Sequence, residues 1–98
     1  MNTKITALHF KADQKLEEFI HEKLNKLDKL SNNIIGSDVI LKIENTEKPN
    51  NKTVEIRLKI KGIDLHAEKT ASSFESAFDH CNDAIHKQLT KSIEKTRV

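Results

Sequence analysis

Cysteine is almost absent from this 98-residue chain, since Cys81 is the only one. A single cysteine cannot form a disulfide within the chain, so a domain of this size must be held together by its hydrophobic core. Small secreted domains often carry several disulfides, and their lack here fits a reducing compartment. We therefore expect a cytoplasmic protein.

Tryptophan and tyrosine are missing, and so are long apolar runs. The four phenylalanines and five histidines leave little material for stacking on single-stranded bases. No stretch of eighteen apolar residues occurs, and no long apolar segment follows the first residues of the chain. The sequence therefore predicts neither a secreted nor a membrane-spanning protein, and it disfavours recognition by base stacking.

Glycine occurs only twice, at Gly36 and Gly62, and proline only once, at Pro49. A phosphate-binding loop combines closely spaced glycines with a following Lys-Ser or Lys-Thr pair, and neither glycine stands in that context. Nucleotide binding is therefore not expected. Pro49 lies among asparagines and lysines, which predicts an exposed loop at 45–52.

The residues that are present predict one ordered domain over 1–98. Apolar residues make up 36% and charged residues 33% of the chain, which is typical of a globular protein with a densely charged surface. The expected elements are a strand at 4–10, a helix at 14–30, a strand at 39–43, a hairpin of strands at 54–60 and 63–67, and a helix at 73–95. This β-α-β-β-β-α order indicates an α+β fold.

Both predicted helices carry start signals. Asp13 stands before the first helix and is a favourable N-cap. Ser72 followed by Glu75 matches a capping box at the start of the second. Acidic residues near the beginning of the second helix and lysines near its end also suit the helix dipole.

The charges of the first predicted helix are sorted by side. At about 100° per residue its apolar residues share one arc, with Lys15, Lys26 and Lys29 on one flank and most acids on the other. Lys23 is an exception because its angle falls within the apolar arc. Its stem can lie over the rim of the core with the ammonium in water, or the ammonium can contact a phosphate.

The second predicted helix repeats this sorting. Lys87, Lys91 and Lys95 share one flank with His80, whereas the acids share the other. A solvated charged face is the usual explanation of one such stripe. Two stripes in one small domain instead indicate a candidate binding surface for an anionic partner.

Catalytic and metal-binding patterns are weak. Cys81 falls in the apolar arc of its helix, so we expect a buried thiol and not a nucleophile. Asp79, Asp83 and His86 have helical spacing and could touch one cation, but no second cluster completes a metal site. We expect no enzyme activity, no cofactor, no metal and no small-molecule substrate.

Several segments of the chain carry a family resemblance when they are taken together. They are LEEFI at 16–20 with Lys23, Lys26 and Leu27, VILKIE at 39–44, HAE at 66–68, SFESAFD at 73–79 and AIHKQLTK at 84–91. In order and spacing they resemble the ribosome hibernation promoting factor family, also known for ribosome-associated translation inhibitors and sigma-factor modulation proteins. The family pattern has Asp and Tyr where this chain has Ser73 and Glu75.

The resemblance implies a four-stranded sheet with both helices on one face, similar to a double-stranded RNA-binding domain. It implies a protein that binds the small ribosomal subunit and its ribosomal RNA, blocks the channel of messenger and transfer RNA, and silences translation in starved cells. This short form would lack the C-terminal dimerisation domain of longer members, and we expect a monomer off the ribosome. The basic positions of the family correspond to Lys23, Lys26, Lys87 and Lys91, and Lys95 extends the second stripe.

The expected topology constrains these stripes. Both helices should run antiparallel to the first strand and therefore parallel to one another, so flanks of the same hand cannot both face outward. One basic stripe should line the groove between the helices, near the acids of the other helix. An alternative function is a protein-interaction adaptor, for which the exposed sheet residues Arg57, Lys59 and Lys61 would matter more than the helices.

Overall fold

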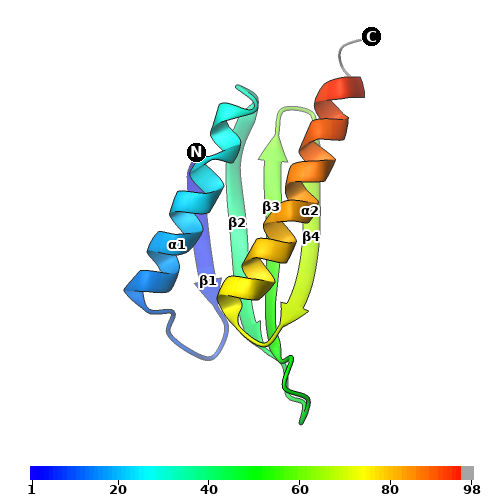
Figure 1. Cartoon of the computed structure of the whole chain (residues 1–98). Helices are drawn as coiled ribbons and strands as arrows, with labels where there is room; N and C mark the ends of the chain where they lie inside the picture. Colours follow the sequence, from blue (N-terminus) through cyan, green and yellow to red (C-terminus); the bar gives the residue numbers. More distant parts are fainter. Residues whose placement is uncertain (96–98) are drawn as a thin grey trace.

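A four-stranded sheet with two helices packed on one face forms the computed structural model of the chain (Figure 1). The structure describes residues 1–95, and side chains are described for residues 1–92. The elements are β1 (Asn2–Ala7), α1 (Gln14–Asn25), a 3-10 helix η1 (Leu27–Lys29), β2 (Ile34–Ile43), β3 (Lys52–Ile60), β4 (Ile63–Ala71) and α2 (Phe74–Lys95). The predicted α+β fold and its element order are confirmed.

The strands lie side by side in chain order. β1 and β2 are parallel, whereas β3 is antiparallel to both of its neighbours. A parallel pair requires a crossover connection, and α1 lies within it. α2 follows β4 across the same face, so both helices run in one direction, opposite to β1, as the sequence predicted (Figure 1).

The hydrophobic core lies between the helices and the inner face of the sheet. β3 shows the pattern most clearly, because Val54, Ile56, Leu58 and Ile60 are all buried while the residues between them carry polar side chains. The helices contribute Leu16, Ile20, Leu24, Ala77, Phe78, Cys81, Ile85 and Leu89. No described element covers the opposite face of the sheet, which is therefore an open polar surface.

The first helix is shorter than its pattern predicts. α1 ends at Asn25, and the chain tightens into η1 through a hydrogen bond of 3.3 Å from the N–H of Lys26 to the carbonyl of Lys23. Such three-residue bonds are common where helices end. The tighter turn keeps Leu27 buried, so the apolar spacing of the sequence continues beyond the α-helix itself.

The second strand begins earlier than predicted, at Ile34 instead of Val39. The turn-forming residues at 31–37 suggested a loop, but Ile34 pairs with Ile60 and a bulge follows it. Gly36 permits this extension because a Cβ there would lie only 2.8 Å from the carbonyl oxygen of Asn2 on β1.

The start of the second helix also differs in detail. The side chain of Ser73 accepts a hydrogen bond of 3.1 Å from the N–H of Ser76, so Ser73 is the N-cap. The predicted capping box of Ser72 and Glu75 is wrong, because Ser72 lies one residue too early. Ser73 can replace an aspartate here, since either side chain supplies an acceptor oxygen.

Candidate nucleic-acid interface

The orientation of α1 is set at its first turn. Asp13 Oδ1 accepts a hydrogen bond of 2.8 Å from the N–H of Leu16, which confirms the predicted N-cap and leaves Leu16 facing the core. Phe19 lies toward α2, where its ring meets the ring of Phe78 edge to face at 5.8 Å. Lys23 lies one turn after Phe19 and therefore faces the same groove.

Lys23 lies between the two helices. Its Nζ is 3.9 Å from Oδ1 of Asp79 on α2 and 5.5 Å from the centroid of the Phe19 ring. An ion pair of this length between partly exposed side chains contributes at most about 1 kcal/mol, so the ammonium remains available to another anion. Lys23, which falls within the apolar arc of α1, thus lies in the groove beside an acid of α2.

The basic flank of α2 faces away from α1. His80 and Lys87 lie over the outer strand of the sheet, where they line a hollow together with Lys69 of β4. Lys91 is exposed one turn further along α2. The side chain of Lys95, also predicted for this flank, lies outside the described side chains.

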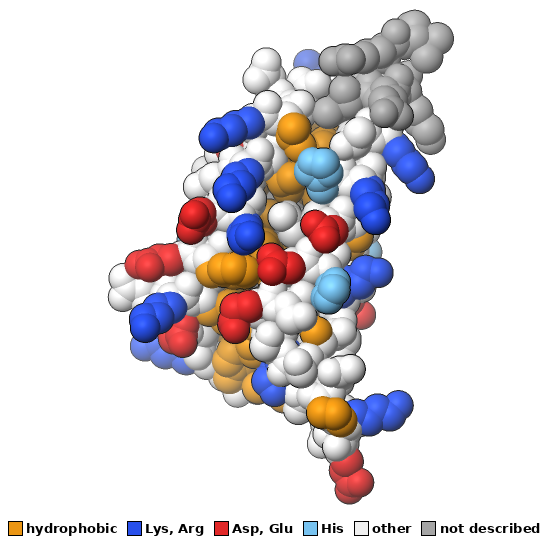
Figure 2. All heavy atoms as spheres, viewed as in Figure 1, with side chains coloured by type: hydrophobic (Ala, Val, Ile, Leu, Met, Phe, Trp, Pro, Cys, Tyr) orange, Lys and Arg blue, Asp and Glu red, His pale blue; other side chains and the backbone are white. Residues whose placement is uncertain are grey.

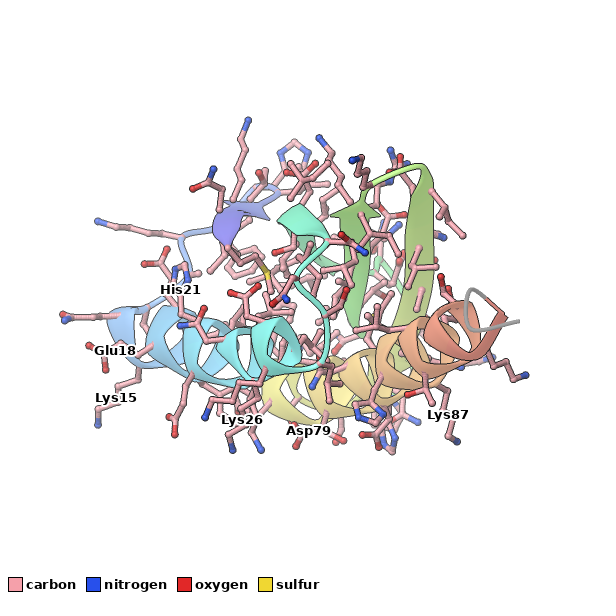
Figure 3. The ribbon with its side chains drawn as sticks, turned by 90° about the horizontal axis from the view of Figure 1, so that it is seen from above. Lys15, Glu18, His21, Lys26, Asp79 and Lys87 are labelled. Atoms are coloured by element: carbon pink, nitrogen blue, oxygen red, sulfur yellow. The ribbon has the colours of Figure 1, made fainter. Side chains whose placement is uncertain are left out.

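The two basic flanks form two rows on the helix face, which we call the α1 row (Lys23 and Lys26) and the α2 row (Lys87 and Lys91). Lysine side chains lie toward both edges of this face, and acidic side chains lie between them and also at the edge formed by α1 (Figure 2). Lys26, Asp79 and Lys87 all point away from the sheet, with Asp79 between the two lysines (Figure 3). The structure therefore brings the predicted lysines onto one face but keeps their rows apart.

The charges of the helix face are largely unpaired. Within the described side chains, Lys26, Lys87 and Lys91 form no ion pair, and Lys23 has only its long contact with Asp79. Each ammonium can therefore meet an external anion without first breaking a strong internal contact.

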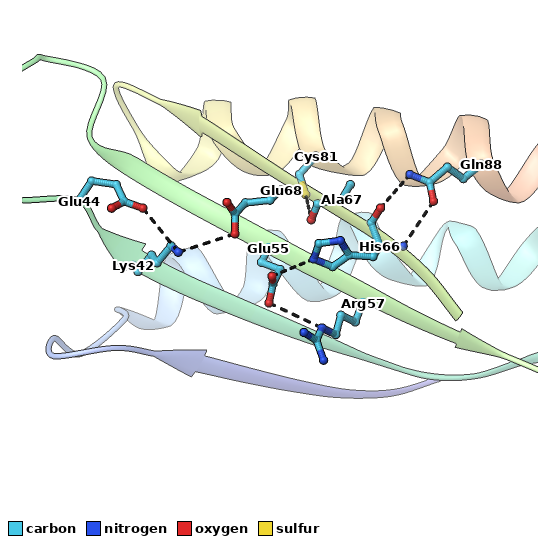
Figure 4. Close-up of polar contacts among 9 residues, drawn as sticks. All are labelled: Lys42, Glu44, Glu55, Arg57, His66, Ala67, Glu68, Cys81 and Gln88. Atoms are coloured by element: carbon cyan, nitrogen blue, oxygen red, sulfur yellow. Dashed lines mark hydrogen bonds and ion pairs between the residues drawn. The ribbon is translucent and has the colours of Figure 1, made fainter. Parts of the chain in front are cut away.

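The open face of the sheet has the opposite character, because its central cations are paired with acids (Figure 4). The ion pairs are Lys59 with Asp38 at 3.5 Å, Lys42 with Glu44 at 3.6 Å and Glu68 at 3.7 Å, and Arg57 with Glu55 at 3.8 Å. Two of the three cations of the adaptor hypothesis, Arg57 and Lys59, thus have an acid within 4 Å, although these exposed pairs are weak, like that of Lys23 with Asp79.

Glu55 is the best connected acid of this open face. Its Oε2 is 2.8 Å from Nε2 of His66, and this hydrogen bond is the main reason why the pKa of Glu55 lies below its usual value of 4.5. His66 is half exposed and lies on β4. The pair links neighbouring strands, and the hollow of about 270 Å³ that His66 lines with Arg57, Asp64 and Leu65 is open to solvent.

Cys81 is a buried thiol, as predicted. It has no exposed surface, and its Sγ donates a hydrogen bond of 3.2 Å to the carbonyl of Ala67 on β4. Burial raises the pKa of the thiol to about 12, which excludes a thiolate nucleophile near neutral pH.

The described residues offer neither a cluster of metal ligands nor a membrane-spanning helix. Among them, no group of three or more His, Cys, Asp or Glu side chains is placed to hold a metal ion. No helix among these residues is both long enough and apolar enough to cross a membrane.

Lys69 is a basic residue of the helix side that the sequence analysis missed. It follows Leu65 and Ala67 at two-residue spacing, so it points to the same side of β4 as these buried residues. A lysine that continues an apolar alternation is the same signal as Lys23 within its apolar arc. The alternation spans only a few residues of β4, but it was visible in the sequence.

Comparison with known proteins agrees with this architecture. A protein from Coxiella burnetii described as a ribosomal subunit interface protein superimposes with a TM-score of 0.85 at 19% identity, covering 96% of this chain and 99% of that one. The N-terminal domain of Protein Y from Thermus thermophilus superimposes with a TM-score of 0.81 at 18% identity, covering 93% and 98%. These structures share the fold.

Sequence relatives point to the same group. The ribosome hibernation promoting factor of Escherichia coli (strain K12) is 28% identical over 97 residues, which cover 99% of this chain and 98% of that protein. The ribosome hibernation promotion factor of Deinococcus radiodurans is 26% identical over 91 residues, which cover 90% of this chain but only 47% of that protein. Residues 3–97 match the family described as sigma 54 modulation protein / S30EA ribosomal protein. Since that match spans nearly the whole sequence, the chain belongs to the sigma 54 modulation protein / S30EA ribosomal protein family.

Proposed function

We propose that this protein associates with ribosomes and keeps them in hibernation by binding folded RNA of the small subunit through its helix face. The observation that carries the proposal is the contrast between the two faces. Lys26, Lys87 and Lys91 are exposed without ion pairs among the described side chains, whereas the central cations of the sheet face are paired. The names of the sequence relatives support the ribosome as the partner.

The mechanism is neutralisation of backbone phosphates by a rigid surface. Lysines release condensed counterions from RNA when they contact phosphates, and this release favours binding without any reading of bases. Folded RNA is recognised largely through its shape and backbone, which suits two helices held on one sheet. Inhibition is then steric, because a domain lodged in the channel of messenger and transfer RNA excludes both.

The proposed role requires no chemistry. The protein acts in the cytoplasm, needs no cofactor or metal, and is a monomer when it is off the ribosome. The buried state of Cys81 and the exposed position of the Glu55–His66 pair are consistent with a binding protein, and none of the relatives named above carries the name of a catalytic activity.

Charge reversal on one face at a time tests the proposal. One variant carries Glu at Lys23, Lys26, Lys87 and Lys91. The matched control carries Glu at four basic residues of the sheet side and its turn, which are Lys4, Arg57, Lys59 and Lys61. Both variants have the same net charge, so they differ only in where the charge is placed.

The readout is cosedimentation with purified small subunits, together with inhibition of translation in a cell-free extract. We expect the helix-face variant to lose both activities and the control to keep them, with circular dichroism showing that each is folded. Our proposal is wrong if the helix-face variant cosediments like the wild type while the control variant no longer cosediments. The binding site would then be the open face of the sheet.

A further inference from the structure

The outer side of α2 holds a hollow that the two lysine rows do not explain. It has a volume of about 490 Å³, opens to solvent, and is lined by Lys69, His80, Asp83, Ala84 and Lys87. The small side chain of Ala84 leaves room between the helix and the strand. Three of the five lining residues carry cationic or hydrogen-bond-donating side chains.

Lys69 reaches this hollow because of its place in the sheet. β4 is an outer strand, and Lys69 lies on its helix side in line with Leu65 and Ala67. His80 and Lys87 are seven residues apart on α2 and therefore share one flank, directly beside Lys69. A strand, β4, and a helix, α2, thus both contribute hydrogen-bond donors to the lining of this hollow.

The contact between α2 and β4 is fixed close to the hollow. Nε2 of Gln88 donates to the carbonyl of His66 at 2.9 Å, and the N–H of His66 donates to Oε1 of Gln88 at 3.4 Å. The Sγ of Cys81 donates to the carbonyl of Ala67 (Figure 4). These contacts hold the helix against the strand, so the backbone positions that carry Lys69, His80 and Lys87 are fixed before a ligand arrives.

The balance of charge favours a single anion. Lys69 and Lys87 are exposed, and neither forms an ion pair within the described side chains. Asp83 is the one acid at the rim, and it also lacks an ion pair among those side chains. Even with a neutral His80, the lining carries one net positive charge, which matches the single negative charge of a phosphodiester.

We propose that Lys69, His80 and Lys87 form a seat for one backbone phosphate of the bound RNA, on the outer side of α2. This inference rests on the proposed function and deepens it by adding β4 to a surface otherwise made by helices. Lys69 and Lys87 supply charge, His80 supplies an N–H donor, and Asp83 weakens the seat by repelling the phosphate.

The test compares Lys69→Gln with Lys4→Gln, a charge-matched control on the open face of the sheet. Binding to purified small subunits is measured as a function of potassium chloride concentration. We expect Lys69→Gln to lower affinity several-fold and to make the slope of log affinity against log salt shallower by at most about 0.7 to 0.9, the value for one phosphate contact, because Lys87 still reaches the same phosphate. Lys4→Gln should leave both quantities near those of the wild type.

Asp83→Asn provides a test in the opposite direction, since removal of the rim carboxylate should raise affinity several-fold. Equal behaviour of Lys69→Gln and Lys4→Gln would overturn the seat while leaving the proposed function intact. A loss of affinity at Lys69→Gln with an unchanged salt slope would indicate an acidic ribosomal protein as the contact and would also overturn it. Absence of wild-type binding would instead refute the proposed function.

Discussion

The thiol of Cys81 is enclosed between α2 and β4, and this position decides its reactivity. Burial raises its pKa to about 12, so almost no thiolate exists at pH 8. We expect the folded protein to react with a disulfide reagent at least about a hundredfold more slowly than the unfolded chain. Absorbance of the released reagent, with and without guanidinium, measures this difference, and equal rates would contradict the burial of Cys81.

Glu55 gives a prediction for the dependence of stability on pH. The hydrogen bond from His66 lowers the pKa of Glu55 in the folded protein below 4.5, so this contact stabilises the fold above the unfolded pKa. The stabilisation is lost as the pH falls through the folded pKa. We therefore expect Glu55→Gln to reduce the free energy of unfolding by at most about 1 kcal/mol at pH 6, and by less below pH 4.

Urea denaturation at both pH values measures this effect, and Glu47→Gln is the matched control. Glu47 is an exposed residue of the loop between β2 and β3, and it forms no ion pair within the described side chains. Its substitution removes the same charge but should leave the free energy of unfolding unchanged. A Glu55→Gln effect that is as large at pH 3 as at pH 6 would argue against the role of His66.

Single residues were predictable where one pattern decided their environment. The burial of Cys81 followed from its position in an apolar arc, because spacing alone determines which side of a helix meets the core. The environment of Lys23 was only partly predictable, since its contact with Asp79 depends on how two separate helices pack. Lys69 was missed because its partners come from α2 rather than from its own strand.

At the scale of single elements, the start of α2 offers a comparison between adjacent serines. Ser73 accepts a hydrogen bond from the N–H of Ser76, whereas Ser72 is exposed outside the helix. Ser73→Ala should therefore lower the free energy of unfolding by about 1 kcal/mol, the usual cost of losing an N-cap. Ser72→Ala should have little effect, and chemical denaturation of the two variants measures the difference.

Equal losses for the two serine variants, or a larger loss for Ser72→Ala, would restore the capping box expected from sequence. The two candidates differ by a single position, and a sequence pattern cannot separate them because element boundaries are its least certain part. Which of the two serines caps α2 depends on the direction in which the chain leaves β4.

The boundaries of α1 and β2 were missed for a similar reason. Apolar spacing continues through Leu27, so the pattern could not show that the helix tightens after Asn25. Polar and glycine residues before Val39 resemble a turn, yet Gly36 serves the close approach of β1. In both cases the deciding contact comes from an element that is distant along the sequence.

At the scale of the whole molecule, the helix face should behave as a set of independent phosphate contacts. The two lysine rows and the predicted Lys95 supply about five contacts, so log affinity for small subunits should fall with log salt at a slope of about −3.5 to −4.5. Titration with potassium chloride at fixed pH measures the slope. Affinity that does not change with salt would rule out phosphate neutralisation as the source of binding.

The architecture as a whole was more predictable than its details. The β-α-β-β-β-α order requires a crossover between β1 and β2 if these strands are parallel, and that crossover makes the helices run in the same direction. That shared direction brings Lys23 of α1 to the side of α2 that carries Asp79, although the contact itself depends on how the helices pack. The sequence could not reveal how each acid pairs on the open sheet face, because those pairs depend on strand register.

The hydrogen bonds of the Gln88 side chain affect how the exposed edge of β4 can meet other chains at high protein concentration. The unpaired edge of a sheet is a template on which another chain can add a strand, and this route leads to aggregation. At His66 the amide of Gln88 occupies both the backbone N–H and the carbonyl that an incoming strand would need. The side chain of a helix thus occupies, at this one residue of β4, the backbone groups that a fifth strand would pair with.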